Sequence, residues 1–246
     1  MVDVFVLRCY RQVMSFFEAY PAKAYIFDKD GTLVDTESIW FEAYTRLLAP
    51  YGITHSLEVH RRMMGLAAGE CIRLLQAEFL VLPQGERGTM PLIEAMWHHF
   101  RLVREEVGVR LMPGVEEMLL ACEKRKIPLA IATSATRVDT ETELSILGWA
   151  KRFQVVVTAE DVARHKPAPD IYLEAARRLG VDPREALAFE DGIHGVKSAH
   201  AAGVPVMFVR DDRFQIEAPA EVTATIASFV ELIEQKASPR KARKKG

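Results

Sequence analysis

The chain has 246 residues, of which 49% are hydrophobic and 27% are charged, a composition typical of a globular protein that can bury a sizeable core. Its formal net charge of −2 gives no global electrostatic reason to expect nucleic acid or a membrane surface as a partner, so any anion must bind at a local site. No stretch of the sequence approaches the roughly 20 uninterrupted apolar residues that a membrane-spanning helix requires.

Residues 1–20 precede the patterned part of the chain and are interpreted as an N-terminal extension. Arg8 and Arg11 interrupt its apolar residues, and it lacks the basic start and the small-residue cleavage site of a signal peptide. The cysteines of the chain are odd in number and widely spaced, as is typical of free thiols in a reducing compartment: Cys9, Cys71 and Cys122. We therefore expect a cytoplasmic protein, and a monomer is favoured.

From Pro21 onward, short apolar runs alternate with segments of helical period. The runs are apolar on successive residues, which is typical of strands buried on both faces of a parallel sheet. They are Ala24–Phe27, Pro128–Thr133, Gln154–Thr158, Ala186–Phe189 and Val204–Val209. The helical segments are Val115–Arg125, Arg137–Leu147, Asp170–Leu179 and Gly192–Ala202. This alternation predicts an α/β fold with a doubly wound, mostly parallel sheet.

Residues 36–110 break the alternation, because they contain amphipathic helical patterns and no convincing strand. A helical insert directly after the first strand would lie over the carboxyl ends of the sheet, where α/β folds bind ligands. We therefore predict a catalytic core formed by residues 21–35 and 111–236, with a helical cap formed by residues 36–110. Residues 237–246 are basic and are expected to form a disordered tail.

The main candidate for chemistry is a pair of carboxylates directly after the first predicted strand. Asp28 and Asp30 lie two residues apart there, and buried carboxylates are costly to place without a purpose. Gly31, which follows them, permits a sharp reversal of the chain. A DxD sequence after a strand is only moderately specific, because surface turns also produce it.

Three later groups of polar residues follow other predicted strands. Thr133 and Ser134 place a hydroxyl and backbone N–H groups at a helix-opening turn, which is a natural phosphate cradle. Lys166 precedes a helix in a proline-stiffened loop, and Glu190 and Asp191 end the strand of the ALAF run. Because the carboxyl ends of parallel strands share one edge of a sheet, these groups are expected to converge with the aspartate pair.

With these four motifs, the sequence resembles the haloacid dehalogenase superfamily, in the branch of phosphatases and sugar phosphomutases of the β-phosphoglucomutase type. The resemblance covers about Lys23 to Ile233 and implies a Rossmann-like core with a helical cap inserted after the first motif. It implies a phosphatase that hydrolyses a small phosphorylated metabolite, a sugar phosphate or similar compound, through an aspartyl-phosphate intermediate.

The resemblance also implies roles for individual residues. Asp28 would be the nucleophile, and Asp30 would protonate the leaving group and later deprotonate the hydrolytic water. Thr133, Ser134 and Lys166 would bind the phosphate group.

The expected cofactor is Mg²⁺. The resemblance implies that the ion is held by the carboxylate of Asp28, the backbone carbonyl of Asp30, and Asp191, with Glu190 as a ligand directly or through water. This oxygen-rich set suits Mg²⁺, which takes few carboxylates together with water and phosphate oxygens.

One residue departs from the family pattern at the first motif. Lys29 stands between the two aspartates, where the family usually has an apolar residue. The simplest expectation is that its side chain points away from the site, and the sequence assigns it no role.

Several alternatives share the same core. A dehalogenase generally lacks the second aspartate, so Asp30 argues against that activity. A phosphonate hydrolase needs a lysine in its cap, and no lysine occurs between Lys29 and Lys124. A non-catalytic phosphate-binding regulatory module would be roughly half this length and without the helical insert, so the full motif set favours turnover.

A sugar phosphomutase is the main alternative. Its members carry a histidine and basic residues in the cap, at the positions of Trp40, Met64 and Ala68 in this chain. A mutase must bind a second phosphate, and these three residues offer no positive charge. Arg61, Arg62 and Arg73 remain as possible substitutes, so the sequence favours a phosphatase but leaves the mutase open.

Overall fold

The computed structural model of the protein describes residues 16–64, 66 and 68–234. Cys9, most of the predicted N-terminal extension and the predicted basic tail lie outside the described residues. Within the described part of the chain, no helix is both long and apolar enough to cross a membrane. Cys71 and Cys122 are buried free thiols.

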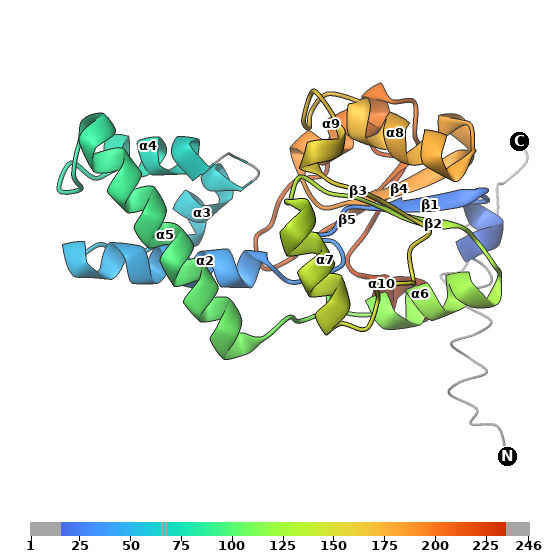
Figure 1. The fold of residues 1–246 in the computed structure, drawn as a ribbon, viewed down its shortest axis with the longest axis horizontal. Coiled ribbons are helices and arrows are strands. Elements are labelled where there is room, and N and C mark those ends of the chain that lie inside the picture. Colours follow the sequence, from blue (N-terminus) through green and yellow to red (C-terminus); the bar gives the residue numbers. More distant parts are fainter. Residues whose placement is uncertain (1–15, 65, 67, 235–246) are drawn as a thin grey trace, which may run out of the picture.

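A parallel sheet of six strands in the order β3-β2-β1-β4-β5-β6 forms the centre of the larger half of the molecule (Figure 1). Its strands are β1 (Ala24–Phe27), β2 (Leu129–Ala132), β3 (Val155–Val157), β4 (Ala186–Glu190), β5 (Val206–Val209) and β6 (Ala224–Ile226). The five predicted strands are all present. β6 was not predicted, because this three-residue edge strand is only partly buried and carries no apolar run.

Helices cover both faces of the sheet, as expected for a doubly wound fold. α8 (Asp170–Leu179) and α9 (Ile193–Ala201) lie on one face, and α6 (Val115–Lys124) and α10 (Phe229–Glu234) lie on the other (Figure 1). α7 (Arg137–Ile146) connects β2 to β3. The predicted helices agree with α6 to α9 to within a residue at each end, and α10 was not predicted. Short 3-10 turns occur at Ala49–Tyr51, Ala159–Asp161 and Pro183–Glu185.

Each face of the sheet buries its own hydrophobic cluster. On one face the rings of Phe27 and Phe189 stack with their centroids 4.7 Å apart, and Tyr25 meets Phe189 edge to face. Phe16 and Phe17 are buried in the same cluster. The last residues of the predicted N-terminal extension therefore pack against the sheet and contribute to its core.

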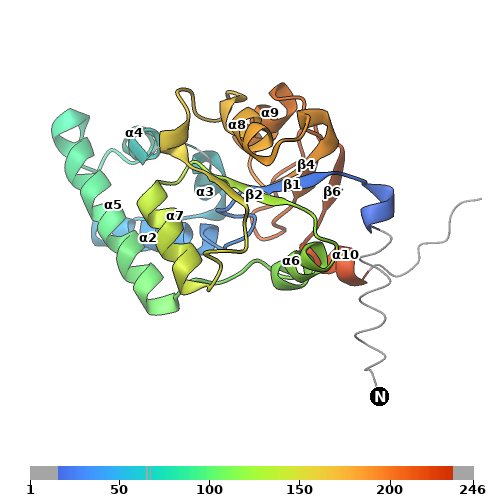
Figure 2. The same ribbon diagram turned by 45° about the vertical axis from the view of Figure 1, so that its right-hand side comes forward.

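The helices α2 (Glu37–Leu48), α3 (Leu57–Met63), α4 (Ala68–Glu78) and α5 (Gly85–Val107) form a separate bundle beside the sheet (Figures 1 and 2). The described residues of this segment form helices and no strand. The bundle has a hydrophobic interior of its own, in which Leu48, Ile72, Leu75 and Met96 are fully buried. The domain bounds stated above stay a prediction, which this separate interior supports.

The two connections between the bundle and the sheet run side by side. The Asp35 N–H donates to the Arg110 carbonyl over 2.9 Å, and the Met112 N–H donates to the Leu33 carbonyl over 3.0 Å. The chain therefore leaves and rejoins the sheet region at one place, close to the end of β1.

Candidate active site

The motif residues follow three strands that are neighbours in the sheet. In the sheet register Phe27, the last residue of β1, lies opposite Ile131 of β2 and Phe189 of β4. Asp28, Thr133 and Glu190 thus come together at one edge, because parallel strands end on the same side. The convergence that the sequence predicted is present.

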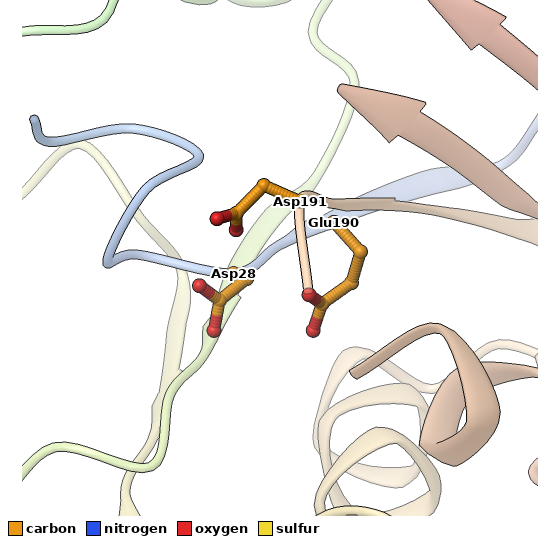
Figure 3. A group of neighbouring side chains, drawn as sticks. All are labelled: Asp28, Glu190 and Asp191. Atoms are coloured by element: carbon orange, nitrogen blue, oxygen red, sulfur yellow. The ribbon is translucent and has the colours of Figure 1, made fainter. Parts of the chain in front are cut away.

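Three carboxylates form an acidic cluster at this edge. Asp28, Glu190 and Asp191 each place one oxygen within 4.8 Å of the others, and Figure 3 shows the three side chains gathered at the ends of their strands. Burial raises the pKa of Asp28 to about 7, and the nearby carboxylates of Glu190 and Asp30 add to the shift while Lys166 opposes it. The pKa of Asp191 is raised for the same reasons, burial first and then the charges of Asp28 and Glu190.

Neighbouring carboxylates, with raised pKa values at Asp28 and Asp191, fit a bound divalent cation. Negative charge removed from water is costly unless a positive charge compensates it. Carboxylate oxygens are the ligands that Mg²⁺ prefers. The acidic cluster, Asp28 with Glu190 and Asp191, therefore has the ligand chemistry that the predicted cofactor requires.

Lys166 supplies positive charge on one side of this cluster. Its Nζ donates to Asp28 Oδ1 and to Glu190 Oε1 over 2.6 Å each, and to the Ala132 carbonyl over 3.0 Å. Burial alone would lower the pKa of Lys166, but the two carboxylates outweigh it and raise the pKa. The ammonium is therefore charged, and it lies directly beside the carboxylate of Asp28.

The structure adds two polar contacts that the sequence analysis did not identify. The Tyr172 hydroxyl of α8 donates to Glu190 Oε1, and the Thr32 hydroxyl donates to Asp191 Oδ1 over 2.8 Å. Each hydroxyl fixes a carboxylate of the cluster. The position of Thr32, directly after the DKDG run, could have identified it. Tyr172 offers no such signal, because a tyrosine in a helix is usually a packing residue.

Gly31 has to be glycine for two reasons. Its φ of +81° lies in the left-handed region, as expected for a sharp reversal. A Cβ atom at this position would lie 2.0 Å from Asp191 Oδ2. The turn after the aspartate pair therefore allows Asp191 to approach the end of β1.

The second aspartate of the pair is held by two neighbours. Thr133 Oγ1 donates to Asp30 Oδ2 over 3.3 Å, and Lys29 Nζ donates to Asp30 Oδ1 over 2.9 Å. The expectation that the Lys29 side chain points away from the site is wrong, because Lys29 is buried and also bonds Glu143 of α7. The sequence could not show this, because the acidic partner lies 114 residues away along the chain.

The remaining predicted residue, Ser134, lies at the bend after Thr133 and is exposed. The Ala135 N–H donates to Thr133 Oγ1 over 3.1 Å, so the turn after β2 is tight. Backbone N–H groups at such a turn suit a phosphate. The structure thus brings Asp28 and Lys166 into one cluster with Glu190, the last residue of β4, and Asp191, which follows it. Asp30 and Thr133 are bonded to each other.

The sequence profile described as "Haloacid dehalogenase-like hydrolase" matches residues 25–209, which include strands β2 to β5, nearly all of β1, the helical bundle and every motif residue. The chain belongs to the haloacid dehalogenase-like hydrolases.

Relatives of this hydrolase include characterised and structurally determined proteins. It is 36% identical to a phosphorylated carbohydrates phosphatase of Thermotoga maritima over 183 residues, which cover 74% of this chain and 82% of the relative. The crystal structure of CbbY from Rhodobacter sphaeroides in complex with phosphate matches with a TM-score of 0.68 and 28% identity, covering 86% of this chain and 96% of that chain.

A β-phosphoglucomutase of Clostridium difficile shares the fold as well. Its structure matches with a TM-score of 0.67 and 21% identity, covering 86% of this chain and 93% of that chain. At this identity the likeness shows the fold alone. The predicted α/β fold and the predicted superfamily are both confirmed, and at the level of the family the prediction of a phosphatase is confirmed by the named relatives.

Proposed function

We propose that this hydrolase is a Mg²⁺-dependent phosphatase that acts on a small phosphorylated metabolite, a sugar phosphate or a similar compound. The observation that carries the proposal is the environment of Asp28. A buried carboxylate with a lysine ammonium 2.6 Å away and a second aspartate two residues along the chain suits attack on phosphorus. The similarity to a phosphorylated carbohydrates phosphatase supports the substrate class.

In the first step, a carboxylate oxygen of Asp28 attacks phosphorus, and an Asp28 O–P bond forms while the ester P–O bond breaks. Asp30 gives its proton to the leaving alkoxide. Lys166, beside the attacking oxygen, offsets the repulsion between the carboxylate and the anionic phosphoryl group. In the second step water attacks phosphorus while Asp30 accepts a proton of that water. The new O–P bond forms as the Asp28 O–P bond breaks, which releases inorganic phosphate and regenerates the Asp28 carboxylate.

The residues that would hold Mg²⁺ are Asp28, Asp191, the backbone carbonyl of Asp30, and Glu190 directly or through water. Glu190 Oε1 accepts from Lys166 and Tyr172, whereas Oε2 accepts only from the Gly192 N–H over 3.4 Å, so Oε2 has more capacity for the cation. When bound, the ion supplies positive charge against the phosphoryl oxygens. The Ser134 N–H would hold the same phosphate, beside the Thr133 hydroxyl, which donates its single proton to Asp30 Oδ2.

Two of the three arginines that could bind a second phosphate, Arg61 and Arg62, favour a phosphatase over a mutase. Arg61 donates to the Phe214 carbonyl and to Gln215 Oε1, and Arg62 pairs with Glu78 over 2.7 Å. These two side chains are therefore engaged by protein groups rather than gathered for a second phosphate. Trp40 packs against Phe100 with ring centroids 4.0 Å apart and brings no charge. A substrate with one phosphate suits this bundle best.

The setting of the enzyme is part of the proposal. The buried free thiols of Cys71 and Cys122 suit a reducing compartment, so we place the enzyme in the cytoplasm, as a monomer with a phosphorylated metabolite as its partner. We assign it no nucleic-acid or membrane partner.

Phosphate release tests the proposed function. The purified protein is incubated with p-nitrophenyl phosphate and with a set of sugar phosphates, with Mg²⁺ and with EDTA. We expect turnover that requires Mg²⁺. Unchanged activity in EDTA would remove the metal from the mechanism, and absence of phosphate release from every ester would overturn the proposal.

A second measurement separates phosphatase from mutase. The protein is given β-glucose 1-phosphate with a trace of glucose 1,6-bisphosphate, and glucose 6-phosphate and free phosphate are followed together. A phosphatase releases phosphate without isomerising the sugar. Formation of glucose 6-phosphate much faster than free phosphate would establish the mutase.

A further inference from the structure

Lys29 and Glu143 form an ion pair next to the active site and away from water. Lys29 is 2% exposed and Glu143 is 4% exposed. The lysine Nζ donates to Glu143 Oε2 and also to Asp30 Oδ1 over 2.9 Å. One ammonium group therefore bridges two carboxylates, one from the first motif and one from helix α7.

Glu143 is held in turn by a residue of the helical bundle. Its second oxygen, Oε1, lies 3.4 Å from Arg104 Nη1, and Arg104 belongs to the last turn of α5. The contacts thus run in a row from Arg104 of the bundle, through Glu143 of α7 and Lys29, to Asp30. These residues are far apart in the sequence, and only the fold brings them into a row.

We infer that Lys29 and Glu143 are positioning residues that fix the orientation of Asp30, and that Arg104 links this pair to the helical bundle. The inference rests on the proposed function, in which Asp30 is the general acid and base. Lys29 binds Asp30 Oδ1 and Thr133 binds Oδ2, so both carboxylate oxygens have a donor. A carboxylate with two fixed donors cannot rotate freely.

A lysine suits this task better than the apolar residue usual at the position. Its ammonium group has three N–H donors, which is enough to bond two carboxylates at once. Glu143 compensates its charge, because an unpaired ammonium could not remain at this depth. The Lys29 ammonium contacts Asp30 and Glu143, so its effect on the reaction passes through Asp30.

The test exploits the leaving group. Asp30 protonates a sugar alkoxide but is hardly needed for p-nitrophenolate, whose low pKa lets it leave unaided. The ratio of kcat/KM for p-nitrophenyl phosphate to kcat/KM for a sugar phosphate therefore rises when Asp30 donates its proton less effectively. The constant kcat/KM covers the reaction only up to formation of the aspartyl phosphate, so slow hydrolysis of that species does not disturb the ratio.

For Lys29→Met, we expect this ratio to rise by about 30-fold, within the roughly 100-fold that a misplacement of about 1 Å can cost. The loss should fall on the sugar phosphate. Because the single change leaves Glu143 buried and short of a partner, the double variant Lys29→Met with Glu143→Leu is measured too. The matched control is Lys23→Met, which removes the exposed Lys23–Glu185 pair and should leave the ratio unchanged.

A double-mutant cycle distinguishes positioning from a structural role. In the Asp30→Asn background, Lys29→Met should cause no further rise in the ratio, because the group through which it acts is gone. A folded Lys29→Met, Glu143→Leu variant with the wild-type ratio would overturn the inference. The inference would also fail if Lys29→Met raised the ratio as much in the Asp30→Asn background as it does in the wild-type protein. Arg104→Gln should raise the ratio by about threefold, and no rise would overturn the link to the bundle.

The wild-type protein and the Asp30→Asn variant test the proposed function, independently of the Lys29 variants. If the wild-type protein hydrolyses neither ester, the proposed function fails and the inference fails with it. If the wild-type protein is active and Asp30→Asn shows the leaving-group effect, the proposed function stands, and only the Lys29 variants decide the inference.

Discussion

The side chains buried at the carboxyl ends of the strands, here called the sheet edge, differ in character from those buried inside the helical bundle. At the sheet edge, buried side chains of opposite charge are paired: Lys166 with Asp28 and Glu190, and Lys29 with Glu143. The interior of the bundle is aliphatic and aromatic, with Ile72, Leu75 and Met96 fully buried. Burying a charge is costly unless an opposite charge lies beside it. The buried charges therefore lie where the strands and α7 place an oppositely charged side chain next to each one.

The buried polar groups of the bundle are of another kind. His55 Nε2 lies 3.1 Å from His60 Nδ1, and His60 Nε2 lies 3.2 Å from Glu37 Oε2. Burial, with a smaller contribution from His60, lowers the pKa of His55 to about 4, so that ring is neutral at pH 7. The sheet edge thus gathers the buried charges of the proposed active site, whereas the bundle interior is mainly apolar. Variants of the two regions should therefore fail in different ways.

The largest effect is expected for Asp28→Asn. The amide keeps the volume of the side chain but removes the nucleophile, which should lower kcat/KM by more than about 1,000-fold for every phosphate ester. Initial rates with p-nitrophenyl phosphate and a sugar phosphate measure it. Asp212→Asn, at an exposed pair with Arg210, is the control. Activity within about tenfold of wild type would contradict the assignment of the nucleophile.

The next effect, for Asp30→Asn, should depend on the substrate. Loss of the general acid should lower kcat/KM for a sugar phosphate by about 100-fold, because its alkoxide leaves poorly without a proton. The effect on p-nitrophenyl phosphate should be much smaller. Rates are compared across a series of esters whose leaving groups differ in pKa. An equal loss for all of them would remove Asp30 from the role of acid.

A third effect concerns Mg²⁺ and pH in the folded protein. In the metal-free protein the pKa of Asp28 is about 7, above the roughly 3.9 of a free aspartate, and the pKa of Asp191 is also raised. A raised pKa in the folded state means stability that is present below the unfolded value and is lost as pH rises toward and through 7. Metal ligands must be deprotonated, so bound Mg²⁺ should restore the stability that is lost at high pH.

We therefore expect Mg²⁺ to raise the melting temperature more at pH 8 than at pH 5.5. Thermal unfolding with Mg²⁺ and with EDTA at both pH values measures the difference. Asp191→Asn should abolish most of the Mg²⁺ effect, while Asp212→Asn should preserve it. An equal rise at both pH values would argue against a cation at the acidic cluster.

The smallest effect on activity is expected from the bundle interior. Met96→Ala should destabilise the protein by about 2–5 kcal/mol, because it leaves a cavity among packed side chains. Well below the melting temperature, kcat/KM for p-nitrophenyl phosphate should stay within about threefold of wild type. Urea unfolding and initial rates measure the two quantities. A large loss of p-nitrophenyl phosphate hydrolysis in a folded variant would break the comparison between the two regions.

The main outline of the fold follows from the sequence because it rests on local patterns. Buried parallel strands are continuous apolar runs, so β1 to β5 were predictable, and Asp170–Leu179 was predicted to the residue. β6 was not, because a short edge strand buries too little to require apolar residues. The extension of the core to Phe16 and Phe17 depends on packing against the sheet, which no local pattern records.

At the candidate site, too, features set by local sequence patterns were predictable and features set by packing were not. Most motif residues were predictable because they lie at the carboxyl end of a strand, and Lys166 because it lies in the loop between a strand and the next helix. The contacts of Lys29 with Glu143 and of Tyr172 with Glu190 were not, because they join side chains from different helices and loops. Glu143 is one of several acidic residues on its helix, and only the direction of α7 against the sheet selects it.

The paired connections at Leu33–Met112 and Asp35–Arg110 have a consequence for how such proteins diversify. Because the chain departs and returns through adjacent backbone segments, the distance between β1 and the rest of the sheet does not depend on how many residues lie between them. Lengthening an insert at such a site adds only slowly to the entropic cost of closing the loop. Evolution could thus lengthen, shorten or replace the helices between these segments while the sheet edge and its charges stay the same.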